Sequence, residues 1–315
     1  MKKIFKKTKF IFYMWIGLFL ILYSCSLKKD VQDSGLAIMK DLNGSDDSLK
    51  KIVGICSFQN NTPYKIQDLK NNIYKVFENS LITVSSDIVP ILPDEEHYSD
   101  VLSIISFLPS SDRIDNYTLS MKARKAGLNE LILFHLIDIR PESRSTGFWF
   151  FRKKHSYSVI TMRLEILDLE TCTKIFDQFF ELNTEIDKIK FDALSDKNKN
   201  DMQIVSTELK ELIKTMGRKA AFEIDKDPWK AYITEIDNEK IKISSGLKSK
   251  VHEGQIFNTY SSGDIISGAG GHRFLMPGNF VGKIEITKVY PLYAIGKILS
   301  GDKIEIGSAI KKIDR

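Results

Sequence analysis

Residues 26–315 of this sequence carry no net charge. The full chain of 315 residues carries 46 basic and 41 acidic residues. Residues 1–25 contain five lysines and no acidic residue, so the rest of the chain has 46 − 5 = 41 basic residues against 41 acidic ones. This balance argues against binding to nucleic acids or other polyanions, so we expect no nucleic-acid partner.

Cysteine is also scarce, because the chain has only Cys25, Cys56 and Cys172. Cys56 lies in an apolar, strand-like run and Cys172 lies in a tight turn. An oxidising compartment would permit a disulfide between these two, but their spacing does not require one. We favour Cys56 as a small buried apolar residue.

Common catalytic and metal-binding motifs are missing. His252-Glu253-Gly254 is not followed by the second histidine of a zinc-protease motif, and the glycine-rich Ser267–His272 lacks the Gly-Lys-Ser/Thr of a phosphate loop. No Gly-x-Ser-x-Gly nucleophile turn occurs. The adjacent residues Glu95-Glu96-His97 cannot all face one metal, and His135 in its apolar run is more simply a buried, hydrogen-bonded histidine. We therefore predict no catalytic, cofactor-binding or metal-binding residue and no enzyme activity.

The first 25 residues have the layout of a secretory signal peptide. Five lysines precede the apolar run Phe10–Tyr23, which is shorter than the about 20 residues of a membrane-spanning helix. The ending Leu22-Tyr23-Ser24-Cys25 resembles the lipobox of bacterial lipoproteins. That resemblance implies acylation of Cys25, by palmitate among other chains, and cleavage before it. An uncleaved N-terminal anchor is the alternative. Ser26, where an aspartate often retains such proteins at the inner membrane, favours the outer membrane and its periplasmic face.

Residues 26–49 are polar and rich in turn formers, which predicts a flexible tether. Residues 50–226 then read as a domain of sheet and helices. We predict strands at Lys51–Phe58, Leu81–Val84 and Leu131–Ile137, helices over residues 66–77, 115–126 and 202–224, and a further helix within 95–108. Tyr157–Leu169 and Ile175–Leu182 form the clearest antiparallel hairpin, a loop with Pro141 and Gly147 precedes it, and the charged residues 188–201 are predicted to be a mobile loop.

Residues 229–315 differ in character, because short strand-like runs alternate there with turns. Strands this short and evenly spaced favour a small barrel or sandwich. The predicted fold class is therefore α+β, an α/β-like sandwich of sheet and helices, followed by a small all-β, barrel-like domain.

Both blocks resemble known envelope proteins. The first resembles the middle domain of FlgT, the N-terminal domain of TolB and the periplasmic domain of the curli-secretion lipoprotein CsgG. Its matching residues are Lys51–Phe58, Ala126-Gly127-Leu128, Leu131–Leu136 and Arg163–Thr173. The second block resembles the C-terminal domain of FlgT. Its matching residues are Gly246-Leu247, Val251–Phe257, Val281–Val289 and Gly301-Asp302.

The resemblance implies a non-catalytic, lipid-anchored module that assembles or binds other envelope proteins, in the building of a surface or flagellar structure. Oligomers are compatible with this role. A second reading is a CsgG-like outer-membrane channel subunit, whose membrane hairpins would correspond to Arg140–Tyr157 and Asn183–Met202. The many charges of the second stretch fit poorly on a lipid-facing strand. A third reading is an envelope hydrolase with a site scattered along the sequence, which a cleft holding a strongly shifted carboxylate or histidine would favour.

The aromatic and basic stretch Phe148–Lys154 is the local feature that stands out most. It reads either as an exposed loop that meets a partner or a bilayer surface, or as the start of a strand whose aromatic rings pack on the core. In the first reading, its cations pair with anionic head groups or acidic side chains. The candidate contact residues are Trp149, Phe150, Arg152, Lys153 and Lys154.

Overall fold

In the computed structural model, the residues described are 48–64, 70–104, 116–196, 205–269 and 272–313. The chain divides into two compact units, residues 1–48 and 49–315, and every helix and strand below belongs to the second. Cys25, the predicted signal peptide and nearly all of the predicted tether lie outside the described residues. Leu49, which the sequence placed in the tether, is 7% exposed and packs in the core of the C-terminal barrel.

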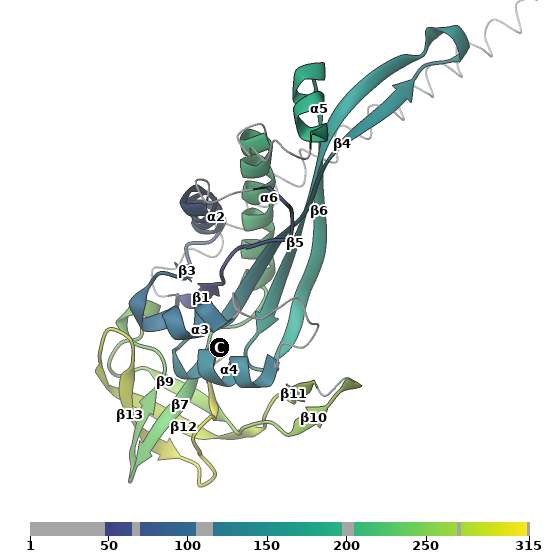
Figure 1. Ribbon diagram of the computed structural model, residues 1–315. Coiled ribbons are helices and arrows are strands. Elements are labelled where there is room, and N and C mark those ends of the chain that lie inside the picture. The colour runs from purple at the N-terminus through teal and green to yellow at the C-terminus, as the bar shows by residue number, and fades with distance from the viewer. Residues whose placement is uncertain (1–47, 65–69, 105–115, 197–204, 270–271, 314–315) are drawn as a thin grey trace, which may run out of the picture. The chain divides into compact units, whose positions relative to one another are not determined.

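A mixed sheet forms the first part of this unit, with the strand order β3-β1-β4-β5-β6 (Figure 1). Strand β1 (Lys51–Ile55) runs parallel to β3 (Ile88–Ile91) and to β4 (Glu130–Thr146), and the short β2 (Gln59–Asn60) also pairs with β4. Strands β5 (Lys153–Asp168) and β6 (Thr173–Ile186) continue the sheet in antiparallel fashion. The predicted hairpin is thus confirmed, with longer strands than the sequence indicated.

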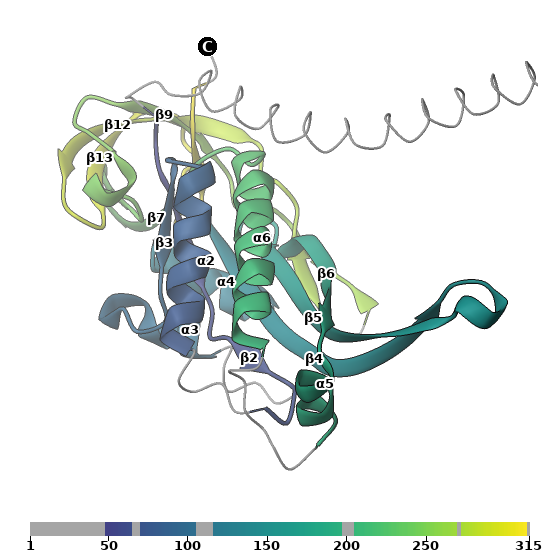
Figure 2. The same cartoon turned by 90° about the horizontal axis from the view of Figure 1, so that it is seen from above.

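Helices cover both faces of the sheet. Helices α2 (Lys70–Val84) and α6 (Ser206–Asp225) lie side by side on one face, as Figure 2 shows. The opposite face of β1 and β4 packs against α3 (Ser99–Ile104) and α4 (Asn116–Lys125), with the short helix η2 (Glu96–Tyr98) before them. The left-handed Gly127 (φ 86°) follows α4, as its sequence predicts.

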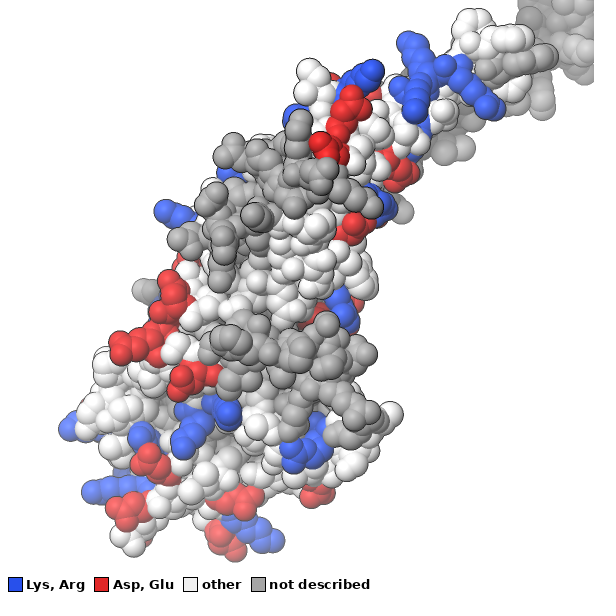
Figure 3. All heavy atoms as spheres, viewed as in Figure 1, with Lys and Arg blue, Asp and Glu red and all other residues white. Residues whose placement is uncertain are grey.

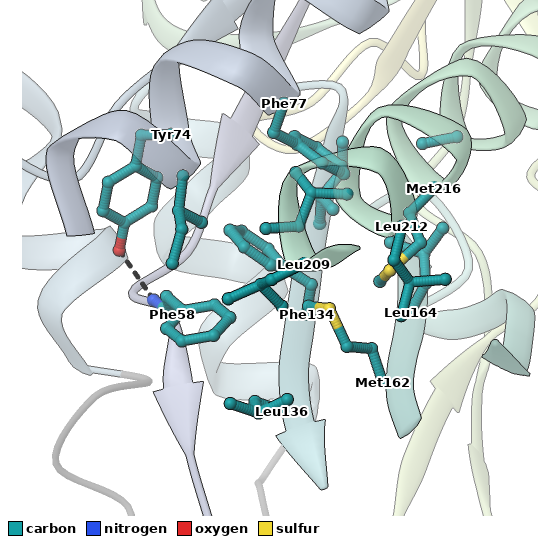
Figure 4. Packing of buried hydrophobic residues seen from close by; sticks show 14 of the residues in the cluster. Phe58, Tyr74, Phe77, Phe134, Leu136, Met162, Leu164, Leu209, Leu212 and Met216 are labelled. Carbon is teal, nitrogen blue, oxygen red and sulfur yellow. Dashed lines mark hydrogen bonds between the residues drawn. The ribbon is translucent and has the colours of Figure 1, made fainter. Parts of the chain in front are cut away.

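The continuous apolar run of β4 is explained by this double cover. Phe134 is fully buried toward α2 and α6, where its ring stacks on Phe77 at 4.9 Å between centroids and lies 5.1 Å from Phe58 (Figure 4). The backbone N–H of Phe58 donates to the Tyr74 hydroxyl at 2.6 Å. The alternate residue Leu131 faces the other helices, so both sides of this strand are core.

The C-terminal part is a closed six-stranded barrel with the order β12-β13-β8-β7-β14-β9. The rings of Trp229 and Phe257 pack against each other inside it, with 5.2 Å between their centroids, among buried isoleucines. Its strands are β7 (Lys230–Asp237), β8 (Lys240–Ile243), β9 (Ile256–Tyr260), β12 (Phe280–Val289), β13 (Ala294–Ser300) and β14 (Ala309–Lys312). A separate two-stranded ribbon, β10 (Ile265–Ser267) with β11 (Arg273–Leu275), and the turn η6 (Leu247–Ser249) lie between strands.

Three sequence predictions of local structure are wrong. Leu81–Val84 is the end of α2 and not a strand, because Leu81 continues the helical face of Phe77 and is fully buried. The strand comes later, at Ile88–Ile91, and tolerates Pro90 because β3 is the sheet edge. The loop predicted around Pro141 is the outer half of β4.

The third error concerns the predicted mobile loop 188–201. Its first half is helix α5 (Lys188–Ser195), whose start is capped by the Asp187 side chain, which accepts a hydrogen bond from the Lys190 N–H at 2.8 Å. Leu194, 3% exposed, anchors this charged helix in the core. Residues 197–204 lie outside the described part.

Two other predictions concern single residues. Cys56 and Cys172 are both buried, and no disulfide joins them. Burial raises the pKa of the Cys56 thiol, in keeping with its role as a small apolar core residue. His135 is largely buried on β4, with Nε2 3.2 Å from Glu165 Oε2 on the neighbouring strand β5.

Candidate contact site at the tip of the β4–β5 hairpin

Strands β4 and β5 form one long hairpin whose outer end projects beyond the helices. Its register runs from Glu130 paired with Asp168 to Thr146 paired with Lys153, with one irregularity between Leu136 and Asp138. Strand β6 ends at Ile186, opposite Ser156, so the last pairs toward the tip belong to β4 and β5 alone. In Figure 1 this two-stranded end extends past helix α5.

The loop that closes the hairpin has a fixed local geometry. Gly147 adopts φ 110°, and a Cβ atom there would come within 2.3 Å of the Phe151 carbonyl oxygen, so only glycine fits. The 3-10 turn η4 (Trp149–Phe151) follows, and the Phe151 N–H donates to the Phe148 carbonyl at 3.1 Å. The chain then enters β5 at Lys153. The aromatic residues therefore lie in a turn at the end of the hairpin and do not start a core-facing strand.

Three phenylalanines at this tip are almost fully exposed. Phe148 is 81% exposed, Phe150 84% and Phe151 85%, and among the large apolar residues of the described chain only Ile189, also at 81%, is as exposed as Phe148. Apolar side chains gathered in one place on a surface commonly mark a site that meets a partner or a membrane. The exposure of Phe148, Phe150 and Phe151 agrees with the exposed-loop reading of Phe148–Lys154 and contradicts the reading in which these three rings pack on the core.

Three cations directly follow the phenylalanines. Arg152, Lys153 and Lys154 are all exposed, and none forms an ion pair with a described residue. In the space-filling view, lysine and arginine side chains gather at this end of the hairpin (Figure 3). The tip therefore combines exposed aromatic surface with positive charge that no described carboxylate neutralises.

The part of the hairpin just below the tip is different, because its charges are paired. We call residues 140–146 and 155–157 the stalk. Arg144 Nε lies 2.8 Å from Glu142 Oε1, Arg140 Nη1 lies 2.8 Å from Asp138 Oδ2, and His155 Nδ1 lies 2.6 Å from Glu185 Oε1. Arg144 also donates to Asn183 on β6 at 2.8 Å. Neutralisation within the stalk leaves the excess positive charge at the tip alone.

Both faces of the stalk are polar. Along β4, the residues from Arg140 to Thr146 include no buried side chain, and neither do those of β5 from His155 to Tyr157. Apart from Pro141 and Tyr157, these positions hold charged residues, histidine, serine or threonine. The continuous apolar face of a membrane-crossing strand, about 9–11 residues long, is therefore absent from this part of the hairpin.

The base of the hairpin holds a denser ionic network on the sheet face away from α2 and α6. Arg163 donates two hydrogen bonds to the Asp177 carboxylate, from Nε to Oδ1 at 2.8 Å and from Nη2 to Oδ2 at 2.6 Å. Lys174 forms an ion pair with Glu165. Burial would raise the pKa of Glu165, but contacts with His135 and Lys174 and the charge of Arg163 outweigh it and lower that pKa to about 2. These groups pair with one another and form a structural network that joins β4, β5 and β6.

The other sequence candidates do not converge on this site. The second stretch assigned to a membrane hairpin, Asn183–Met202, comprises in its described part the end of β6 and helix α5, so no second hairpin forms there. Among the described residues, no group of three or more His, Cys, Asp or Glu is placed to hold a metal ion. None of the described helices is long and apolar enough to cross a membrane.

Sequence reasoning missed two parts of the site. Phe148 and Phe151 belong to the exposed set as fully as Phe150 does. The stalk was read as a loop because Pro141 interrupts it, although proline is tolerated where β4 is an edge beyond its pairing with β1 and β2. The alternation of charge at Arg140, Glu142 and Arg144 was the available signal.

Comparisons with known proteins add fold-level likenesses only. The sequence matches no protein-family model and no curated protein. The hypothetical protein CT253 from Chlamydia trachomatis is 10% identical, over 56% of this chain and 99% of its own, with a TM-score of 0.36. The lipoprotein GNA1162 from Neisseria meningitidis is 7% identical, over 49% of this chain and 98% of its own, with a TM-score of 0.28. The PelC dodecamer from Paraburkholderia phytofirmans is 12% identical, over 54% of this chain and 87% of its own, with a TM-score of 0.30.

We carry no role over from these proteins, because the TM-scores are low. The resemblance to FlgT, the TolB N-terminal domain and CsgG stays a prediction.

Proposed function

We propose that this chain is a lipid-anchored, non-catalytic binding module of the bacterial cell envelope, and that the hairpin tip is its contact site. The observation that carries the proposal is the exposure of Phe148, Phe150 and Phe151, each above four-fifths, at the end of a fixed hairpin. A surface of this kind is kept where it meets another component, because exposed apolar patches otherwise favour aggregation. The backbone pairing of β4 with β5 continues to Thr146 and Lys153, which places the tip at the end of the hairpin.

The anchor in this proposal is Cys25. The lipobox-like Leu22–Cys25 and the balanced charge of residues 26–315 support a protein that is exported and tethered, facing the periplasm at the outer membrane. Stable anchoring takes more than one acyl chain, and bacterial lipoproteins carry three. The partners in this account are the membrane, through the lipid, and other envelope components, through the tip.

The channel reading has less support. A channel subunit needs strands with one continuous lipid-facing apolar side. The stalk carries Glu142 and Arg144 at alternate positions, so the same side of β4 is charged twice within three residues. We therefore rank the binding module first.

The test is complementation of a strain that lacks the gene. Wild type, Cys25→Ser, a tip variant and a matched control variant are compared for membrane attachment and for resistance to detergents. The tip variant is Phe148→Ser with Phe150→Ser and Phe151→Ser. The control changes three other exposed apolar residues, Ile189→Ser (81% exposed), Leu247→Ser (58%) and Ile306→Ser (62%).

The proposal expects Cys25→Ser to leave the membrane fraction. It expects the tip variant to remain attached, at wild-type abundance, yet to fail to restore resistance, while the control variant restores it. Full complementation by the tip variant would refute the contact site, and unchanged attachment of Cys25→Ser would refute the anchor.

A further inference from the structure

We infer that the component met by the hairpin tip is the surface of an anionic phospholipid bilayer, which the phenylalanines enter to head-group depth. The inference rests on the proposed function, because it names the partner of the same site. A bilayer interface offers an apolar layer beside a layer of negative charge. The tip presents Phe148, Phe150 and Phe151 next to Arg152, Lys153 and Lys154 in the same order.

Charge complementarity favours a lipid surface over a second copy of this chain as the partner. Arg152, Lys153 and Lys154 have no carboxylate partner among the described residues, so they form a local concentration of positive charge. The acidic residues nearest along the hairpin, Glu142 and Glu185, are already paired with Arg144 and His155. A second copy that docked tip to tip would therefore have to break stalk ion pairs in order to offer these acids to the tip. Anionic head groups supply that charge at no such cost.

The depth of entry is limited by the stalk. The apolar part of the hairpin is the loop from Gly147 to Phe151, about one turn of chain, whereas the hydrocarbon core is about 30 Å thick. Beyond it, the chain entering β5 carries the exposed cations Arg152, Lys153 and Lys154, whereas β4 carries the polar Ser145 and Thr146 and then the ion-paired Arg144. Amphipathic elements of this size enter only about 5–10 Å, at the boundary of head groups and acyl chains. The tip is therefore an interfacial contact and not a membrane-crossing segment.

The anchor and the tip can reach one bilayer. Between Cys25 and Leu49 the chain has 49 − 25 = 24 residue steps, which span at most about 80 Å. Leu49 lies four residues before Val53, which pairs with Glu130, and Thr146 is 16 residues further along β4. These 20 strand steps correspond to about 66 Å. The chain is thus long enough for a lipidated Cys25 to sit in the membrane that the tip touches.

Trp149 makes the contact measurable. The sequence has three tryptophans, Trp15 in the predicted signal peptide, Trp149 at the tip, and Trp229, which is 6% exposed in the barrel core. The lipidated full chain is reconstituted into vesicles of phosphatidylethanolamine and phosphatidylglycerol, or of phosphatidylcholine alone. Lipids brominated at a shallow or at a deep acyl position then quench the emission. Trp149→Phe keeps an aromatic ring and defines the background from Trp229.

In the anionic vesicles we expect a blue shift of Trp149 emission and quenching at least twofold stronger from shallow than from deep bromines. Both effects should weaken in 0.5 M salt and in neutral vesicles. Arg152→Gln with Lys153→Gln and Lys154→Gln should remove them. The matched control, Lys122→Gln with Lys125→Gln and Lys303→Gln, changes three other exposed cations and should leave them intact.

Three results would overturn the inference. They are no quenching in any vesicle, equal or stronger quenching from deep bromines, and a spectral change that depends on protein concentration and not on lipid. The last points to a second copy as the occupant. None of them touches the proposed function, which stands or falls on complementation by the tip variant.

Discussion

Lys230 Nζ lies 2.7 Å from Asp168 Oδ1, and both side chains are only 4% exposed. This buried ion pair joins the first strand of the barrel to the inner end of β5. Lys230 also lies 3.2 Å from Glu170, and its backbone carbonyl accepts a hydrogen bond from Asn129 at 2.5 Å. Burial opposes the charge of Lys230, but Asp168 and Glu170 outweigh it and raise the pKa of the ammonium group. This charged, dehydrated junction is thus one of the contacts that join the barrel to the sheet.

Removing one partner of this ion pair should lower the stability of the fold. Lys230→Met leaves the Asp168 carboxylate buried without its main cation, so we expect a loss of about 3–5 kcal/mol in the free energy of unfolding. Urea unfolding measures it. Lys242→Met, which breaks the exposed pair with Glu235 at 2.8 Å, is the matched control and should cost less than about 1 kcal/mol. Equal losses for the two variants would show that the junction adds no special stability.

Glu130 predicts a pH dependence of stability at the same junction. Its carboxyl group is fully buried. Burial, with Asp168 and Asp227 nearby, raises its pKa to about 8, although Lys51 and Lys230 oppose this. The folded protein thus holds this proton more tightly than the unfolded chain, whose value is near 4.5. The Glu130 contribution is most favourable below that value and is lost as the pH rises toward 8.

The measurement is urea unfolding of wild type and Glu130→Gln at pH 5 and at pH 8. Glutamine copies the neutral carboxyl group, so the variant should gain stability relative to wild type on going from pH 5 to pH 8, by on the order of a few kcal/mol. A difference between the two proteins that does not change with pH would contradict a protonated Glu130.

Gly217 sets the distance between helices α2 and α6. A Cβ atom there would come within 2.7 Å of Ser80 Cβ and 3.0 Å of the Phe77 carbonyl oxygen. We expect Gly217→Ala to destabilise the protein by about 1–3 kcal/mol, even though alanine favours a helix by about 1 kcal/mol. Thermal unfolding measures this, with the exposed neighbour Arg218→Ala as the control, expected within about 0.5 kcal/mol of wild type. A more stable Gly217→Ala would show that the helices can move apart freely.

Gly147 should control the tip without controlling the fold. Gly147→Ala places a methyl group against the Phe151 carbonyl and strains φ, so the loop must change its conformation. We expect faster hydrogen exchange at the Phe151 N–H and a change of under about 1 kcal/mol in global stability, since the loop lies outside the core. Gly254→Ala, also at positive φ but with nothing near its Cβ, serves as control. Unchanged exchange at Phe151 would mean that the turn does not need Gly147.

Burial patterns made much of the fold predictable from sequence. The continuous apolar run Leu131–Ile137 marked a strand covered on both faces, and the alternation from Ile160 to Ile166 marked the hairpin. The long helical face of α6 and the short, evenly spaced strands of the barrel were equally clear. Each of these patterns is visible because buried apolar positions recur at the regular spacing of a helix or a strand.

Elements in which buried apolar residues do not recur at regular spacing could not be predicted. The outer half of β4 is held by backbone pairing and by contacts such as Arg144 with Asn183, which are 39 residues apart. At the junction, Asp168 and Lys230 look like an ordinary turn acid and a surface lysine until the fold brings them together. The exposed tip was found because its aromatic and basic residues are adjacent in sequence, so no long-range contact was needed.

Photo-crosslinking in living cells shows whether the hairpin tip touches a bilayer. A benzophenone amino acid replaces Phe151 in one strain and Ile306, an exposed residue of the barrel, in another. After irradiation, mass spectrometry of the purified protein identifies what is attached. We predict phospholipid adducts at position 151 and none at position 306. A protein adduct at position 151, or the same lipid yield at both positions, would contradict this prediction.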